Sequence, residues 1–158
     1  MNEASSAAIY FVPEAYSVSG EKLMGRNAAG QSFLEGYFQY GKCETFWAYV
    51  TEADHYKQFQ TLASDLAIKQ ETRGFLSTNL AQAEKAGLIY YPGPDLSDLA
   101  VKRGQFGSAK WSLCGITHTT SSARAMDSIA SWLTAPLQPW DAIICTSSAV
   151  KKNVELIL

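Results

Sequence analysis

Residues 111–122, WSLCGITHTTSS, contain the pattern that decides the predicted fold. The run from 111 to 116 is apolar and has the length of a buried strand, while residues 119–122 supply hydroxyl groups of the kind that cap a helix N-terminus. Apolar residues at helical spacing follow, namely Met126, Ile129 and Leu133. The stretch therefore predicts a buried strand that leads directly into an amphipathic helix.

The same alternation recurs along the whole chain. Strand-like runs also lie at 8–12, 45–50, 88–91 and 142–145, and segments with helical spacing or helix caps separate them. Residues 70–75 are ambiguous by pattern. Strands that alternate with helices need crossover connections, which make neighbouring strands parallel. We therefore predict a three-layer α/β fold, in which a mainly parallel sheet carries helices on both faces.

Composition narrows the classes of protein to which the chain can belong. With 158 residues, of which 47% are hydrophobic and 18% charged, it has the size and apolar content of one folded domain. The formal net charge of -2 argues against a basic nucleic-acid-binding module. The cysteines are odd in number and widely spaced, so neither a disulfide framework nor a zinc site is predicted.

The sequence also gives no sign of membrane insertion or export. No apolar run approaches the roughly 18 residues of a membrane span, and the N-terminus lacks the basic start of a signal peptide. We therefore expect a cytoplasmic protein. The apolar end of the chain, at residues 155–158, suggests either that the chain is cut there or that a further part normally packs against it.

A glycine-bearing segment after the first predicted strand is the first candidate binding site. Residues 17–30 contain Gly20, Gly25 and Gly30, and we expect a loop that leads into a helix near Gln31. Ligands of parallel α/β sheets bind beyond the carboxyl ends of the strands, and a helix N-terminus there offers N–H groups to a phosphate. A flexible surface loop without function is the alternative interpretation.

Two further candidate segments follow the fourth and fifth predicted strands. His118 lies just past a strand end and precedes four hydroxyl residues, so it is placed to donate to a hydroxyl or phosphate group. Helix capping is the alternative interpretation of these hydroxyls, and for residues 146–148, which are again rich in hydroxyls, it is the favoured one. We interpret Asp95 and Asp98 as helix-capping groups, and the acidic residues form neither a catalytic pair nor a metal motif.

Three segments together resemble the N-terminal half of bacterial glycosyltransferases of the glycogen-synthase-like group. They are GRNAAGQSFLEGY at 25–37, GITHTTSS at 115–122 and QPWDAIICTSSAV at 138–150. Those enzymes fold as two Rossmann-like domains facing a cleft, the arrangement known as GT-B. The resemblance implies that residues 1–158 form a single acceptor-side domain whose donor-binding C-terminal domain is absent.

The resemblance also implies a reaction and roles for individual residues. The reaction is retaining transfer of a hexose from a nucleotide sugar to an unknown acceptor, without a metal or other cofactor. His118 would meet the transferred sugar as the catalytic residue, and the segment from Gly25 to Gly30 would approach the donor diphosphate. The predicted substrate-binding residues are Gly25, Arg26, Asn27, Gly30, Thr117, Thr119 and Ser147.

Two other classes of function are compatible with an α/β fold. One is a stand-alone Rossmann-like module that binds a nucleotide or a partner and catalyses nothing. The other is a nicotinamide-dependent oxidoreductase, which is disfavoured because no G-x-G-x-x-G motif follows the first strand. The length of the parent reading frame separates the first alternative from a glycosyltransferase domain.

Overall fold

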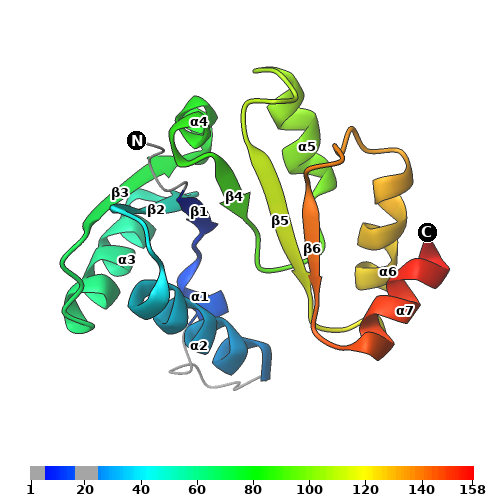
Figure 1. Ribbon diagram of the computed structural model, residues 1–158, viewed down its shortest axis with the longest axis horizontal. Helices are drawn as coiled ribbons and strands as arrows, with labels where there is room; N and C mark the ends of the chain where they lie inside the picture. The colour runs from blue at the N-terminus through cyan, green and yellow to red at the C-terminus, as the bar shows by residue number, and fades with distance from the viewer. Residues whose placement is uncertain (1–5, 17–24) are drawn as a thin grey trace. The chain divides into compact units, whose positions relative to one another are not determined.

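The computed structural model describes residues 6–16 and 25–158, and the chain divides into two compact units. The first unit is Met1–Gly87 and the second is Leu88–Leu158. Within the described residues, each unit contains three strands, and every strand pairing inside a unit is parallel (Figure 1).

The first unit is built around a central strand that pairs on both sides. Its elements are β1 (Ala7–Tyr10), α1 (Pro13–Tyr16), α2 (Gly25–Tyr40), β2 (Thr45–Val50), α3 (Ala53–Asp65), β3 (Glu71–Leu76), the 3₁₀ helix η1 (Ser77–Gln82) and α4 (Ala83–Ala86). Strand β2 pairs with β1 and β3, with Ala48 opposite both Ile9 and Gly74. Since β2 is central, all its residues from Phe46 onward are buried.

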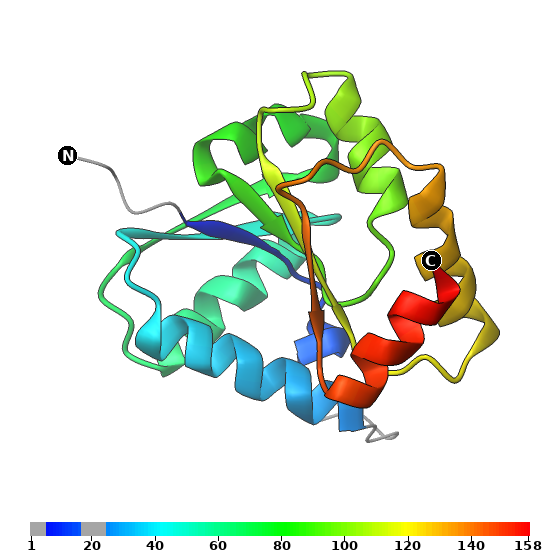
Figure 2. The same cartoon turned by 45° about the vertical axis from the view of Figure 1, so that its right-hand side comes forward.

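Helices lie on both faces of the first unit's strands. Helices α2 and α3 lie on one face and α4 on the other (Figures 1 and 2). Between the strands and the α2–α3 layer, Phe38 contacts Phe46 and Phe59, with ring centroids 5.0 and 5.1 Å apart. This aromatic cluster is the part of the core that joins the two helices to β2.

The second unit repeats the strand–helix alternation. Its elements are β4 (Leu88–Tyr90), α5 (Ser97–Gly104), β5 (Ser112–Thr117), α6 (Ala123–Ala130), the 3₁₀ helix η2 (Ser131–Leu133), β6 (Ala142–Cys145) and α7 (Ser148–Ile157). Strand β5 pairs with β4 and β6, with Leu113 opposite Ile89 and Gly115 opposite Ile143. Successive right-handed crossovers in one direction place their helices on one face, and α5, α6 and α7 lie together in Figures 1 and 2.

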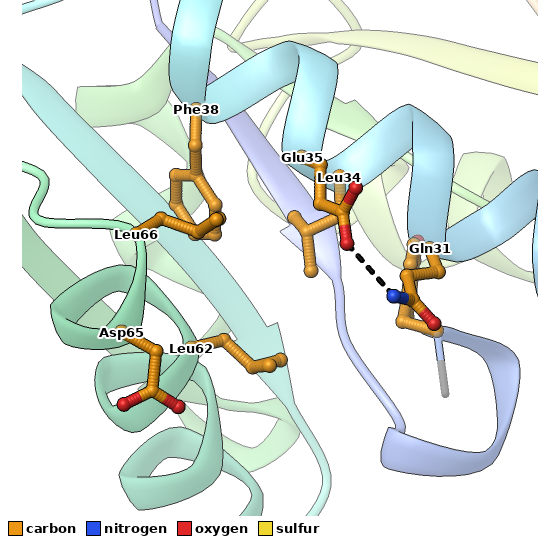
Figure 3. Close-up of a pocket in the computed structure, with 8 residues that line it drawn as sticks. Gln31, Leu34, Glu35, Phe38, Leu62, Asp65 and Leu66 are labelled. Atoms are coloured by element: carbon orange, nitrogen blue, oxygen red, sulfur yellow. Dashed lines mark hydrogen bonds between the residues drawn. The ribbon is translucent and has the colours of Figure 1, made fainter. Parts of the chain in front are cut away.

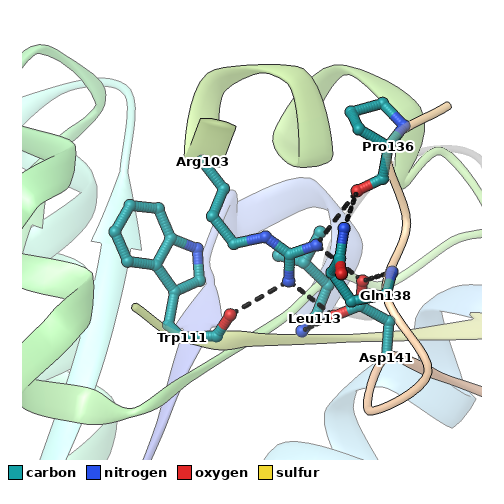
Figure 4. Close-up of polar contacts among 6 residues, drawn as sticks. All are labelled: Arg103, Trp111, Leu113, Pro136, Gln138 and Asp141. Atoms are coloured by element: carbon teal, nitrogen blue, oxygen red, sulfur yellow. Dashed lines mark hydrogen bonds and ion pairs between the residues drawn. The ribbon is translucent and has the colours of Figure 1, made fainter. Parts of the chain in front are cut away.

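A buried ion pair closes the amino ends of β5 and β6 (Figure 4). The guanidinium of Arg103, which is fully buried, donates from Nη1 and Nη2 to the two carboxylate oxygens of Asp141 at 2.6 and 2.7 Å. Nη1 also donates to the Trp111 carbonyl at 3.0 Å, and Asp141 accepts from the backbone N–H groups of Leu113 and Gln138. The pair therefore anchors the α6–β6 connection to α5 and β5.

The α/β class and the parallel sheet that the sequence predicts are confirmed. The strands expected near Ile9, Trp47, Ile89, Leu113 and Ile143 are present. The pattern did not predict β3, because this strand pairs with β2 on one side and most of its side chains face solvent. It contains Gly74, whose missing side chain leaves room for the Tyr56 ring, 2.4 Å from where a Cβ would lie.

Candidate functional site

The carboxyl ends of the second unit's strands form one edge from which three loops leave. We call the residues that follow β4, β5 and β6 at this edge, 91–96, 118–122 and 146–147, the carboxyl edge. Thr117 pairs with Cys145, so the chain leaves β5 and β6 at the same level. The loop after β4 stays beside them, because the Gly93 carbonyl accepts from the Ile116 N–H at 3.2 Å. Parallel α/β sheets bind ligands at this kind of edge.

His118 is the first residue beyond β5, and its side chain is exposed. Its neighbours differ sharply in exposure, since Thr117 is fully buried and Thr119 is exposed. The Thr119 hydroxyl accepts from the Ser121 N–H at 3.1 Å and shares a hydrogen bond with the Ser121 hydroxyl at 2.7 Å. The loop is thus held in a local turn that presents an imidazole and hydroxyl groups to solvent.

Two helices begin at the carboxyl edge with serine caps, as the sequence predicts. The Ser122 hydroxyl accepts from the Ala125 N–H at 3.2 Å, and the Ser147 hydroxyl accepts from the Val150 N–H at 3.1 Å. A cap of this kind satisfies one of the four N–H groups that a helix start leaves unpaired. Neither α6 nor α7 has an acidic residue in its first turn, so both starts keep the positive end of the helix dipole.

A side chain of α7 and one that directly follows β6 hold the loop after β5 in place. Thr146 donates through its hydroxyl to the Thr117 carbonyl at 3.0 Å. Asn153, one turn into α7, donates from Nδ2 to the Thr120 hydroxyl at 2.9 Å. These two bonds join segments that are about 30 residues apart, and they fix the position of His118 from both sides.

The loop after β4 is fastened to α6, and here the structure corrects a prediction. Asp95 and Asp98 do not cap α5, whose N-cap is Leu96 without a side-chain bond. Asp95 instead accepts a short hydrogen bond from the Ser128 hydroxyl, and its other oxygen lies 3.8 Å from an Arg124 nitrogen. The reason is geometric. Helix α6 lies close enough to this loop for the hydroxyl of its buried Ser128 to bind the Asp95 carboxylate.

The glycine segment of the first unit is helical where the sequence predicts a loop. Helix α2 begins at Gly25 rather than near Gln31, so Gly25 to Gly30 form its first turns. A Cβ at Gly30 would lie 2.1 Å from the Ala15 carbonyl oxygen, which shows that this glycine allows α1 and α2 to touch. Residues 17–24, the rest of the predicted loop, lie outside the described residues.

The other predicted site residues of this segment differ in their exposure and contacts. Gly25 is exposed at the helix N-terminus, with open space where a side chain would lie and no acidic residue in the first turn. Asn27 donates from Nδ2 to the Glu14 carbonyl at 2.8 Å, so it too connects α2 with α1. The Arg26 backbone is part of α2, and its side chain lies outside the described part of the structure.

The structure thus places the predicted site residues in both units. Thr117, His118, Thr119 and Ser147 lie at or next to the carboxyl edge of the second unit, whereas Gly25, Asn27 and Gly30 belong to the first. Sequence reasoning missed Asn153 and Ser128, which position the loops of that edge. Neither residue stands out in the sequence pattern, because the partner of each lies 33 residues away along the chain.

Among residues 6–16 and 25–158 no group of three or more His, Cys, Asp or Glu side chains is arranged to hold a metal ion. In the same part of the chain, no helix combines the length and the apolar character that a membrane span requires. Cys43, Cys114 and Cys145 are free thiols, and burial raises the pKa of Cys114.

Comparison with known proteins gives no relative. No family model, no curated protein and no solved structure matches the chain. The resemblance of the three segments to glycosyltransferases therefore stays a prediction from the sequence.

Proposed function

We propose that the chain is the acceptor-side domain of a nucleotide-sugar-dependent, retaining glycosyltransferase, in which the carboxyl edge of the second unit faces the transferred sugar and its phosphate. One observation carries the proposal. His118 projects from the end of β5, among hydroxyl groups and beside two capped helix N-termini without acidic first-turn residues. Two of the three segments that resemble glycosyltransferases, 115–122 and 138–150, contribute to this edge.

The charge at this edge suits the proposed reaction. When a nucleotide sugar reacts, the bond between the anomeric carbon and the phosphate oxygen breaks, and the leaving diphosphate keeps the electron pair. Free N–H groups at helix starts and the positive ends of helix dipoles stabilise such an anion. Arg124, exposed in the first turn of α6, adds a positive charge there, which the Asp95 carboxylate 3.8 Å away partly offsets.

The imidazole of His118 suits the sugar side of the same ligand. A neutral imidazole has one donor and one acceptor nitrogen, so it is able to bind a sugar hydroxyl in either direction. The acceptor hydroxyl loses a proton as it forms the new glycosidic bond, and an exposed base near the reacting carbon is one route for that proton. His118 therefore serves in the proposal as the group nearest to the transferred sugar.

Calorimetric titration of the 158-residue chain tests this assignment. The probes are UDP-glucose and ADP-glucose, each compared with its free nucleoside diphosphate. We expect His118→Ala to weaken binding of the nucleotide sugar by about fivefold to thirtyfold, the effect of losing one or two hydrogen bonds. The affinity for the free diphosphate should change little, because the sugar is then absent.

The second histidine of the chain provides the matched control. His55 lies in α3 of the first unit, where its Nδ1 is 3.4 Å from the Thr51 hydroxyl. His55→Ala should leave both affinities unchanged. Equal effects of the two substitutions, or no binding of any of the four probes to the unsubstituted chain, would overturn the proposal.

A further inference from the structure

We propose that a cavity in the first unit, between α1, α2 and α3, binds a small organic ammonium ion with an aromatic or branched aliphatic body. The cavity has a volume of about 160 Å³, is partly open to solvent, and is lined by residues of these three helices together with Leu66, the residue that follows α3 (Figure 3). It belongs to the first unit alone and shares no residue with the carboxyl edge of the second. The proposal is therefore independent of the glycosyltransferase function.

The apolar lining of the cavity suits one small ring. Tyr16, Leu34 and Phe38 line it and are almost fully buried, with 2%, 3% and 2% of their surfaces exposed. Leu34 and Phe38 are one helical turn apart on α2, and Leu62 faces them from α3 in Figure 3. An apolar cavity of about 150 Å³ holds one benzene molecule, so the volume fits a single aromatic ring.

The polar groups around the cavity are acidic. Glu35 of α2 and Asp65 of α3 both line it, and both residues are exposed. Gln31 donates from Nε2 to Oε1 of Glu35 at 2.8 Å, which holds that carboxylate beside the cavity (Figure 3). Among the residues and side chains that the structure describes, no lysine or arginine lines the cavity and neither carboxylate has a basic partner.

Charge and shape together select the class of ligand. Two carboxylates whose described surroundings hold no basic side chain attract a cation and repel an anion. Aromatic side chains in the lining add a further preference for cations. The apolar interior requires that the charge sit at one end of an otherwise apolar molecule, because an ion buried there would lose its hydration. A protonated arylalkyl amine meets all of these requirements.

Amide NMR titrations with three small probes of equal size test the proposal. Benzylamine carries the positive charge, benzyl alcohol is its neutral counterpart, and benzoate is the anion. We expect benzylamine to shift the amide signals of Leu34, Phe38 and Leu62 saturably, with an affinity at least about fivefold above that of benzyl alcohol. Benzoate should bind most weakly, and added salt should reduce the affinity for benzylamine alone.

Charge-removing variants connect the binding to the two carboxylates. Glu35→Gln and Asp65→Asn should each weaken benzylamine binding by about twofold to fivefold, the effect of one exposed ion pair, and should leave benzyl alcohol binding unchanged. Glu44→Gln removes the same charge from an exposed position in the first unit that does not line the cavity. This control should bind benzylamine as the unsubstituted chain does.

Several results would overturn the proposal. Equal affinities for benzylamine and benzyl alcohol would show that the carboxylates select nothing. Shifts confined to amides away from α1, α2 and α3 would move the binding elsewhere. Tighter binding of a short lysine-containing peptide than of benzylamine would replace the small amine by a protein partner.

Discussion

Tyr37 is the residue whose environment has the clearest pH consequence. Its hydroxyl donates to the Ala7 carbonyl at 3.0 Å and accepts from the Ala7 N–H at 3.1 Å, so it fastens the start of β1 to α2. Burial raises the pKa of Tyr37 to about 12. An acid whose pKa is raised by folding stabilises the native state below its unfolded pKa, and this contribution is lost as the pH rises through the folded value.

The first prediction follows from this shift. The contribution of Tyr37 to the free energy of unfolding should fall by about 2 kcal/mol between about pH 10 and pH 12, since one pKa unit corresponds to about 1.4 kcal/mol. Tyr37→Phe should remove much of this alkaline loss, and at pH 7 it should cost about 1–2 kcal/mol through the lost hydrogen bonds. Urea unfolding followed by circular dichroism at pH 7, pH 10 and pH 12 measures both effects.

The matched control for this variant is Tyr40→Phe. Tyr40 is 74% exposed at the end of the same helix. Its substitution should therefore change neither the free energy of unfolding at pH 7 nor its loss at alkaline pH. Burial also raises the pKa values of Tyr10 and Tyr90, so Tyr37→Phe should reduce the alkaline loss without abolishing it. An unchanged pH dependence in Tyr37→Phe would contradict the assignment.

The Arg103–Asp141 pair gives a second prediction at the residue scale. Asp141→Asn leaves the guanidinium of Arg103 buried without its counter-charge, which should cost about 3–5 kcal/mol. Glu71→Gln makes the same change in the exposed pair with Arg73, where both side chains are about half exposed, and should cost less than about 1 kcal/mol. Chemical denaturation of both variants at pH 7 tests the contrast, and similar losses would contradict the buried geometry.

Helix α2 provides a test at the scale of one element, because two of its glycines have opposite surroundings. Gly30 touches the Ala15 carbonyl, whereas nothing lies within 4 Å of where a Cβ would be at Gly36. Gly30→Ala should therefore destabilise the protein by about 1–3 kcal/mol through overpacking. Gly36→Ala should stabilise it by about 0.5–1 kcal/mol, because alanine favours the helix. Thermal denaturation of the two variants measures both changes in stability. A Gly30→Ala variant that is more stable than the Gly36→Ala variant would refute the α1–α2 contact.

The elements also show how far the sequence predicts the structure. Local signals succeeded where the partner is close in the chain: Ser122 and Ser147 cap helices through N–H groups three residues ahead. They failed where the partner is distant. The glycines of α2 look like a loop because their packing partner, α1, is invisible in the pattern, and Arg103 gives no hint that Asp141 lies opposite it.

In the candidate site, too, the local features were predictable from the sequence and the long-range contacts were not. His118 and its hydroxyl neighbours were predictable, since a polar run after a buried strand marks the carboxyl edge of a parallel sheet. The bonds that hold the edge together were not, because Asn153 with Thr120, and Ser128 with Asp95, meet only through the folded topology. A single sequence therefore locates the edge but not the side chains that position it.

At the scale of the whole molecule, the proposed function predicts what the chain does on its own. The resemblance to glycosyltransferases implies a second domain that holds most of the nucleotide contacts. Transfer requires both reactants to be held in one geometry, so the 158-residue chain should not transfer or hydrolyse UDP-glucose or ADP-glucose at a useful rate. Chromatographic detection of released nucleoside diphosphate measures this. Robust turnover that survives His118→Ala would contradict the proposed domain and its site.

The most direct test of the central claim is an amide NMR titration of the chain with UDP-glucose. The claim places the ligand at the carboxyl edge of the second unit, so the largest shifts should fall on His118, Thr119 and the first-turn amides of α6 and α7. Binding should be weak, since the resemblance assigns most nucleotide contacts to another domain. Shifts clustered at the opposite ends of β5 and β6, around Leu113 and Gln138, would contradict the claim.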